Sequence, residues 1–327
     1  MPRLAVLAPL AALAALGTLT AAPAGAAAHG TTDQITFARQ LPGGGADVFI
    51  TSPDGSNTHQ VPLVYPAEDF GIPIWSPDRS QLLISTILRS DASGNLLPFR
   101  PATVGLDGSS FKLLEPPNAP FDTGCFGGWY AGGSRLLCGF GDNQPGVFSI
   151  RASDGGDPVR LTTYPYGACN ACDTPADVSP DGRRFVFLRF KNENTTHQQV
   201  ALFVEKLDGT GLRQLTPYGL AEPHEIASAQ WSPDGQEIIS ETTQGRLFVV
   251  HPDGTGLTMI RLRTGTTQYF AFEPDWSPDG TRIVFCMNIN GLEDIYTANA
   301  DGSNLVQVTN TPAFENGPDW GRSPIAH

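Results

Sequence analysis

The segment Trp276-Ser277-Pro278-Asp279-Gly280 decides the fold, because related segments recur along the chain. The segment Trp231-Ser232-Pro233-Asp234-Gly235 is identical to it, and the copies that begin at Trp75 and Val178 each differ from it at one end. Two weaker copies complete the series, whose six anchor positions are 75, 129, 178, 231, 276 and 320. Neighbouring anchors are 44 to 54 residues apart, a period typical of propeller blades.

A second turn signal, an Asp-Gly pair, occurs once in each repeat. The six pairs are Asp54-Gly55, Asp107-Gly108, Asp154-Gly155, Asp208-Gly209, Asp253-Gly254 and Asp301-Gly302. Around the anchor at 276, short runs rich in β-branched and aromatic residues alternate with turn residues, at 273–276, 281–285, 294–298 and 305–309. Because no long stretch of the sequence has helical periodicity, we predict an all-β chain of four-stranded antiparallel blades.

The two ends of the sequence predict how the ring of blades closes. After Trp320 the chain has seven residues, so the sixth repeat has only its first strand at this end. Three strand-like runs near the other end, at 34–39, 47–50 and 60–64, match the missing second, third and fourth strands. We therefore predict a six-bladed β-propeller closed by one C-terminal and three N-terminal strands, an arrangement that leaves no open sheet edge between the first and last blades.

The N-terminal region has the features of a secretory signal peptide. Arg3 precedes an Ala/Leu-rich apolar run at 4–19, and small residues at 24–28 fit a cleavage site. We predict a signal peptide at 1–28, a linker at 29–33, the propeller at 34–322 and a tail at 323–327. An uncleaved membrane anchor is the alternative for the leader. The prediction places the mature protein outside the cytoplasm, either secreted or in the periplasm and cell envelope, with no membrane insertion after cleavage.

Composition limits the classes of partner. The formal net charge of −13 argues against nucleic acid and anionic membrane surfaces, because their phosphates would be repelled. The 36 glycines and 28 prolines suit a protein made of many short strands and turns. We expect a monomer that binds no nucleic acid.

The five cysteines indicate disulfide chemistry in an exported chain. Cys125 and Cys138 lie on neighbouring segments of one repeat, so we expect a disulfide between them. Cys169 and Cys172 form a CxxC pair in a loop, where a local disulfide is favoured over zinc or redox chemistry. Cys286 lies within an apolar run and is expected to be a buried free thiol.

The complete repeat resembles that of the TolB propeller domain. The W-S-P-D-G turn is followed by an I-x-F strand, by D-I-Y and by D-G-S/T-x-L-x-x-L-T, over roughly residues 34 to 322. The resemblance implies a WD-like six-bladed propeller, a repeat that also occurs in prolyl-oligopeptidase-type peptidases and in some polysaccharide lyases. We expect no counterpart of the α/β domain that precedes the propeller in TolB, which argues against a Tol-Pal envelope role.

Candidate binding residues lie in the loops that lead into each first strand, because such loops gather on one face of a propeller around its channel. The candidates are Glu68, Asp69, Asp122, Asp173, Asp177, Glu222, His224, Glu225, Asp275, Glu315 and Asp319, and Glu273 belongs to the same set of loops. Three interpretations stay open for them: solvated acidic loops, a site for a protein or basic peptide, and a divalent cation site in the central channel.

The sequence favours a binding function over catalysis. It lacks the nucleophile elbow G-x-S-x-G, the H-E-x-x-H pair and a phosphate loop, so we predict no catalytic residue and no cofactor beyond that possible cation. The leading hypothesis is a non-catalytic scaffold that binds a protein or another ligand at the channel face. The alternative is a metal-assisted lyase or hydrolase acting on an extracellular polysaccharide, in which His224 would be the one histidine near the channel.

Overall fold

A computed structural model describes residues 33–42, 44–65, 69–115, 122–140, 146–162, 173–192, 198–220, 229–265, 269–289 and 291–321. Within these ranges every regular element is a β-strand, and no helix long and apolar enough to cross a membrane was found. The predicted signal peptide, most of the predicted linker and the C-terminal tail lie outside the described residues.

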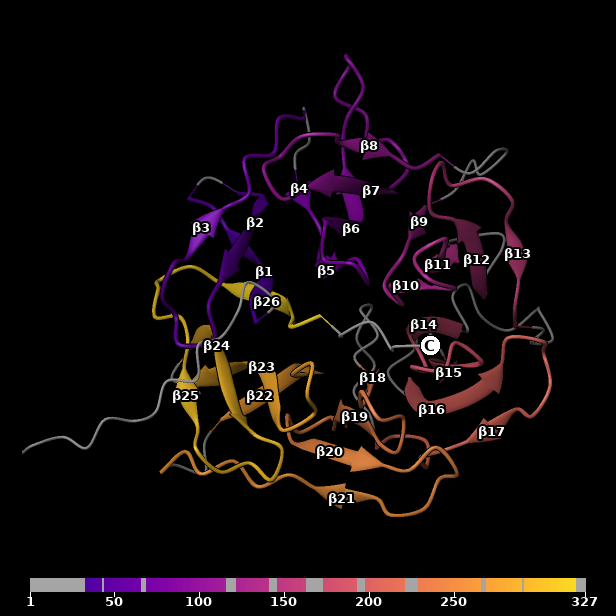
Figure 1. Ribbon diagram of the computed structural model, residues 1–327, viewed down its shortest axis with the longest axis vertical. Helices are drawn as coiled ribbons and strands as arrows, with labels where there is room; N and C mark the ends of the chain where they lie inside the picture. Colours follow the sequence, from indigo (N-terminus) through magenta and orange to yellow (C-terminus); the bar gives the residue numbers. More distant parts are fainter. Residues whose placement is uncertain are drawn as a thin grey trace, which may run out of the picture. The chain divides into compact units, whose positions relative to one another are not determined.

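Six antiparallel sheets, numbered here as blades 1 to 6 in chain order, are arranged in a ring (Figure 1). Blade 1 contains β26 (Glu315–Asp319), β1 (Ile35–Gln40), β2 (Ala46–Thr51) and β3 (His59–Gln60). Blade 2 contains β4 (Asp69–Phe70), β5 (Pro73–Trp75), β6 (Gln81–Leu88), β7 (Arg100–Gly105) and β8 (Lys112–Leu113). Blade 3 contains β9 (Thr123–Gly124), β10 (Trp129–Tyr130), β11 (Arg135–Phe140), β12 (Val147–Arg151) and β13 (Val159–Arg160).

The other three blades have four strands each. Blade 4 contains β14 (Asp173–Val178), β15 (Arg184–Lys191), β16 (Gln199–Lys206) and β17 (Arg213–Gln214). Blade 5 contains β18 (Ala229–Trp231), β19 (Ile238–Glu241), β20 (Leu247–Val250) and β21 (Thr258–Met259). Blade 6 contains β22 (Phe270–Trp276), β23 (Arg282–Ile289), β24 (Leu292–Asn299) and β25 (Val306–Gln307). In blades 2 and 3 the first strand is split in two, and both pieces pair with the second strand.

The predicted closure is confirmed. Strand β26 pairs antiparallel with β1, placing Thr36 opposite Asp319 and Arg39 opposite Glu315. The order β26-β1-β2-β3 combines one C-terminal strand with three N-terminal strands (Figure 1). The chain is therefore an all-β, six-bladed propeller.

Arg79 holds the closing blade against blade 2. Its Nη1 donates to the carbonyl of Trp320 at 2.8 Å, and its Nη2 donates to the carbonyl of Gln34 at 3.0 Å. Arg79 occupies the position at which the identical repeats have glycine, and its φ of 57° is left-handed like that of Gly280 at 70°. The arginine thus accepts a strained backbone, and its side chain connects both ends of the described chain.

The S-P-D-G segments are turns, as the sequence predicts. In the turn at 276, Ser277 Oγ donates to Asp279 Oδ1 at 2.7 Å, and the backbone N–H of Thr281 donates to the same oxygen at 3.0 Å. The turn that starts at Ser232 repeats this pattern, since Ser232 Oγ lies 2.7 Å from Asp234 Oδ1. These aspartates are accordingly turn formers that bond the local backbone.

The tryptophans of the repeat pack between blades. Trp231 and Trp320 are buried in clusters that combine side chains of neighbouring sheets. The guanidinium of Arg184, on blade 4, lies over the Trp231 ring of blade 5 at 4.7 Å from its centroid. Arg282, on blade 6, lies over the Trp320 ring in the same way at 5.1 Å. Burial and cation–π contact together hold adjacent blades in register.

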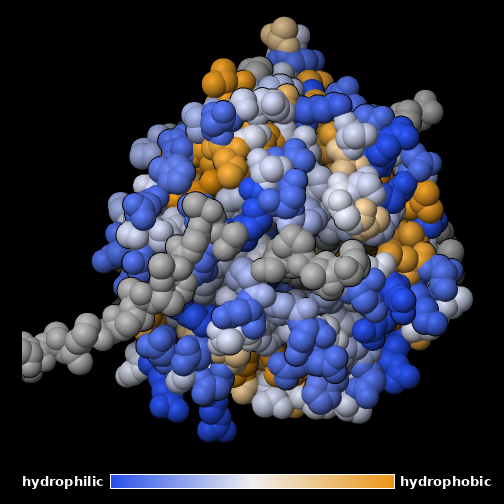
Figure 2. Space-filling view, in the orientation of Figure 1, coloured by the Kyte–Doolittle hydropathy of each residue, from blue (hydrophilic) through white to orange (hydrophobic). Residues whose placement is uncertain are grey.

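The cysteine predictions are confirmed where the structure describes these residues. Cys125 and Cys138 form a disulfide within blade 3, and Cys286 is buried and free. Cys169 and Cys172 lie outside the described residues. A disulfide is in keeping with an oxidising compartment. The face of the propeller seen in Figure 2 is mostly hydrophilic, with apolar side chains in small separate patches.

Candidate binding cavity

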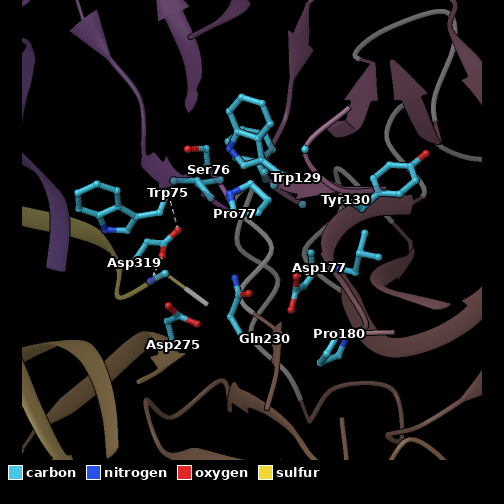
Figure 3. A pocket seen from close by; sticks show the side chains of 18 of the residues that line it. Trp75, Ser76, Pro77, Trp129, Tyr130, Asp177, Pro180, Gln230, Asp275 and Asp319 are labelled. Atoms are coloured by element: carbon cyan, nitrogen blue, oxygen red, sulfur yellow. Dashed lines mark hydrogen bonds between the residues drawn. The ribbon is translucent and has the colours of Figure 1, made fainter. Parts of the chain in front are cut away.

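A cavity of about 660 Å³ lies where the innermost strands of the blades meet. Its described wall comes from the first strand of each blade and from the turns that follow several of these strands. Asp177, Asp275 and Asp319 and the amide of Gln230 lie around the same opening (Figure 3). Three of the predicted site residues are thereby brought together from blades 4, 6 and 1.

Each of these three aspartates also joins its blade to the next one. The backbone N–H of Trp231 donates to Asp177 Oδ2 at 2.7 Å. Two equivalent bonds run from Trp320 N to Asp275 Oδ2 at 2.9 Å and from Trp75 N to Asp319 Oδ2 at 3.1 Å. The repeat explains the pattern, because each acceptor directly precedes the anchor residue of its own blade and each donor is the anchor of the following blade. A single sequence position thus fixes blade contacts and places charge at the channel.

Two of the carboxyl groups have raised pKa values. Burial raises the pKa of Asp319 to about 6, while hydrogen bonds from Gly321 and Trp75 and the charge of Arg79 oppose the rise. Burial, and next the charge of Asp319, raise the pKa of Asp275 well above its ordinary value. Asp275 is 6 % exposed, whereas Asp319 is only half-buried at the cavity wall, so water in the cavity screens Asp319 more. The channel therefore contains acidic groups that favour a positively charged neighbour.

Glu273 is a further acidic group of the wall, which also includes the turn residues Asp78 and Asp181. Its Oε2 accepts a hydrogen bond from the backbone N–H of Gly317 at 2.7 Å, and the Cys286 thiol lies 3.6 Å away. Its φ of 52° is left-handed, which is costly for a residue with a side chain. The bond to Gly317, in the next blade, is the contact that offsets this strain.

Aromatic and proline side chains also line the opening. Trp129 and Tyr130 of β10 and the turn prolines Pro77 and Pro180 surround it (Figure 3). These residues were not among the sequence candidates, which were acidic residues and one histidine in the loops before the first strands. Their regular position after each first strand was the signal that could have found them. The cavity wall thus combines carboxyl groups with aromatic and proline side chains.

The remaining described candidates lie outside the cavity wall and serve local structure. Asp69 accepts from Ala46 N at 2.7 Å, and Asp122 accepts from Phe99 N at 2.7 Å. Asp173 forms a buried two-bond ion pair with Arg189, at 2.7 and 2.8 Å. Glu315 is buried and accepts from Arg39 Nε at 2.7 Å. Glu68, Glu222, His224 and Glu225 lie outside the described residues.

The described acidic residues do not form a metal cluster. Among the residues that the structure describes, no group of three or more His, Cys, Asp or Glu side chains has the geometry to hold a metal ion. The three channel aspartates already use oxygens to accept backbone N–H groups, at Trp231, Trp320 and Trp75.

Comparison with solved structures identifies the architecture. TolB from Acinetobacter baumannii superposes with a TM-score of 0.62 at 15 % identity, over 89 % of this chain and 67 % of that one. A putative TolB from Agrobacterium tumefaciens gives a TM-score of 0.62 at 16 % identity, over 89 % and 94 %. The chain has the TolB-like propeller fold. No protein-family model and no curated protein sequence matches it.

Other solved structures with a similar fold have names that describe different functions. An oligogalacturonate lyase in complex with manganese superposes with a TM-score of 0.52 at 14 % identity, over 85 % of this chain and 74 % of that one. A chain of a nidogen/laminin complex gives a TM-score of 0.57 at 8 % identity, over 88 % and 97 %. At such identities the likeness concerns the fold alone, so function has to be argued from the cavity.

The raised pKa of Asp319 predicts a pH dependence of stability. The folded pKa of about 6 exceeds the unfolded value of about 3.9, so the native state binds the proton more tightly. The protonated Asp319 carboxyl makes its full contribution to the free energy of unfolding below the unfolded pKa. That contribution is lost as the pH rises through the folded pKa. We expect Asp319→Asn to be less stable than wild type near pH 4, since it loses one acceptor. By about pH 7 the difference in free energy of unfolding between wild type and variant should be smaller by on the order of 1–2 kcal/mol. Denaturant unfolding at the two pH values measures it.

Asp107→Asn provides a control of opposite sign. Hydrogen bonds from the side chain and backbone of Ser109 lower the pKa of Asp107, which lies on an exposed turn. Its stabilising contribution is present above the unfolded pKa and is lost as the pH falls. The difference in free energy of unfolding between wild type and Asp107→Asn should therefore increase as the pH rises. A difference for Asp319→Asn that stays constant would mean that this carboxyl has no raised pKa.

Proposed function

We propose that this protein is an exported, non-catalytic propeller whose channel cavity binds a protein partner through a cationic, extended segment. The observation that carries the proposal is the cavity itself, with Asp177, Asp275 and Asp319 around one opening that aromatic and proline side chains also line. A lysine or arginine side chain matches both features, because its head group pairs with carboxylates while its methylenes pack on apolar surface.

The proposal is supported by the size and chemistry of the cavity. A volume of about 660 Å³ is in the range that holds a small ligand or a few residues of a peptide. The half-buried Trp129 and Tyr130 are of the types that dominate binding energy at interfaces. Protonation is also relevant: since Asp319 has a pKa of about 6, a cationic ligand should bind more weakly below that pH.

Binding of labelled decapeptides tests the proposal. A library that contains lysine flanked by proline and aromatic residues should yield binders, and a matched library with glutamine in place of lysine should not. We expect Asp177→Asn to weaken the best binder about tenfold, since one charge contact is removed. The matched control is Asp69→Asn, which also removes a carboxylate that accepts a backbone N–H but lies outside the cavity wall. Equal binding of both libraries, or equal loss in both variants, would contradict the proposal.

Export is part of the same proposal and has its own test. The predicted leader at 1–28 and the Cys125–Cys138 disulfide both support it. Expression of the full chain in a bacterial host, followed by fractionation and mass measurement, should recover a shortened chain outside the cytoplasm. Recovery of the full-length chain in the membrane fraction would favour the uncleaved anchor.

The metal-assisted enzyme is a second candidate, and the observation in its favour is the likeness of fold to an oligogalacturonate lyase bound to manganese. Elemental analysis of the purified protein separates the two functions. Stoichiometric metal that is lost in His224→Ala, together with turnover of an acidic glycan, would favour the enzyme. Protein binding without turnover across a panel of glycans favours the scaffold.

A further inference from the structure

A second cavity lies between blades 4 and 5 and has the opposite charge. It has a volume of about 470 Å³ and is lined by Arg184, Lys206, Arg213 and His251 and by one acidic residue, Asp253, with Val204 and Pro252 among its apolar members. We call it the basic groove. The whole chain has only 20 lysines and arginines and a net charge of −13, so three of them in one groove, next to a histidine, stand out.

The sheet register places two of these cations face to face. Arg184 of β15 lies directly opposite Lys206 of β16. Like charges in such a cross-strand pair are destabilising. Arg213, on β17, is paired with Val204, two positions from Lys206, and therefore points to the same face of the blade. A repulsive arrangement on one face is what a site for an anion requires.

The groove cations form no close ion pair among the described residues, although carboxylates lie near them. The charge of Arg213 acts on Asp253, that of Lys206 on Asp208 and that of Arg184 on Asp181. Arg213 Nη1 donates to the backbone carbonyl of Asp253 at 3.0 Å, and Arg184 stacks on the Trp231 ring. Stacking leaves the edge of a guanidinium, which carries its N–H donors, open to a ligand.

The acidic residues nearby are engaged in their own turns. Asp253 Oδ1 accepts from the backbone N–H and the hydroxyl of Thr255, at 2.9 and 2.6 Å. Asp208 Oδ1 accepts in the same way from Thr210, at 2.9 and 2.6 Å. Asp181, near Arg184, accepts from Ser179 Oγ at 2.6 Å. These carboxylates reduce the field of the groove without occupying the hydrogen-bond donors of its cations.

The groove and the channel cavity lie next to each other at two turns. Gly235 lines the groove, and a β-carbon at this position would lie 3.6 Å from Cδ of Pro180, which lines the channel cavity. The two cavities are therefore separated by the packed turns at Pro180 and Gly235 and lie close enough for one extended ligand to contact both. Val204 and Pro252 offer apolar contact for the methylene groups of such a ligand, while the cations face its charged ends.

We propose that the basic groove is a second subsite, which binds the carboxylates of an acidic polypeptide segment. Arginine matches a carboxylate with two parallel hydrogen bonds, and a glutamate side chain supplies both the carboxylate and the methylenes. The choice of a polypeptide rests on the proposed function of the channel, whereas the binding of carboxylates to the groove does not. A full ligand would accordingly carry a cationic segment followed by an acidic one.

Fluorescence anisotropy with a labelled hexaglutamate peptide tests this subsite at low salt. The peptide should bind despite the negative charge of the protein, and hexaglutamine should not. The double variant Lys206→Ala/Arg213→Ala changes two exposed side chains and should weaken binding at least tenfold. Lys112→Ala, an exposed lysine on blade 2, is the control and should leave it unchanged.

Each other outcome has a defined meaning. Absence of hexaglutamate binding, or equal weakening in the control, would overturn the subsite. Binding of inorganic phosphate or of an oligouronate in place of hexaglutamate would overturn the polypeptide assignment. If the double variant still binds the lysine decapeptide as tightly as wild type does, the groove and the channel are distinct sites. If the lysine decapeptide binds and hexaglutamate does not, the channel function stands and the groove proposal fails.

Discussion

A chain that ends at Thr311 is expected to lose cooperative folding altogether. The truncation removes β26, which is the inner strand of blade 1, and with it the antiparallel pairing to β1. It also removes Trp320, which is buried at 1 % exposure between blades 6 and 1. Loss of a buried tryptophan alone costs about 3–5 kcal/mol. The total stability of a domain is only about 5–15 kcal/mol, so the loss of a whole strand besides exceeds what the fold can tolerate.

Three contacts that cross the closure disappear with the same truncation. They are the bond from Trp320 N to Asp275, the bond from Trp75 N to Asp319, and the ion pair of Arg39 with Glu315 at 2.7 Å. The first two connect blade 1 to its neighbours on both sides. Without them, blade 1 is no longer tied to blades 6 and 2, and the edge of β1 that paired with β26 is left open.

Thermal unfolding followed by circular dichroism measures this effect. The truncated chain should show no cooperative transition and should aggregate, because the unpaired β1 exposes a strand edge. The control is a chain that ends at Gly321, which keeps β26 and Trp320 and should retain the wild-type midpoint. A cooperative transition at an unchanged midpoint in the shorter chain would contradict the role of the closure.

The sequence predicts the fold well because each copy of the repeat contains the turn residues and the buried residues of its own blade. Trp276 and Trp320 mark equivalent first strands, and the incomplete last repeat implied its three missing strands near Ile35. The Cys125–Cys138 pair followed from positions within one repeat. Such features depend on local turns and on a fixed period, which a single sequence displays.

The candidate site was only partly predictable, because its members meet through neighbouring blades. Asp177, Asp275 and Asp319 were found since they precede anchor residues. Asp173 looked equivalent to them, but it is committed to Arg189, a partner that only the register of β14 and β15 reveals. The basic groove was missed for the same reason: Arg184 and Lys206 are far apart in sequence and become neighbours only through strand pairing.

Gly302→Ala is expected to be a strongly destabilising substitution in a hairpin turn. Gly302 has a φ of 80°, and a β-carbon there would lie 2.5 Å from the backbone carbonyl oxygen of Arg261, in the linker that leaves blade 5. An alanine at a left-handed position costs about 1–2 kcal/mol by itself. Overlap with a backbone atom cannot be relieved by a side-chain rotation and adds about 1–3 kcal/mol, so we expect a total of about 3 kcal/mol or more.

The chain offers a closely matched control in Gly209→Ala. Gly209 occupies the equivalent Asp-Gly turn of blade 4 with a φ of 79°, and its N–H donates to Lys206 O at 2.9 Å, as Gly302 N–H does to Asn299 O at 2.8 Å. No atom lies within 4 Å of a β-carbon built at Gly209. This variant should therefore be destabilised only by the cost of placing alanine in a left-handed conformation, about 1–2 kcal/mol.

The difference between the two variants in urea unfolding isolates the contact between blades 5 and 6. Both substitutions change the unfolded chain equally, so their effects on its entropy cancel. We expect Gly302→Ala to be less stable than Gly209→Ala by about 2 kcal/mol. Equal free energies of unfolding would mean that the hairpin tip of blade 6 can move away from Arg261 at no cost. In that case the glycine would serve turn geometry alone, and the packing of neighbouring blades would depend on the tryptophans and the channel aspartates.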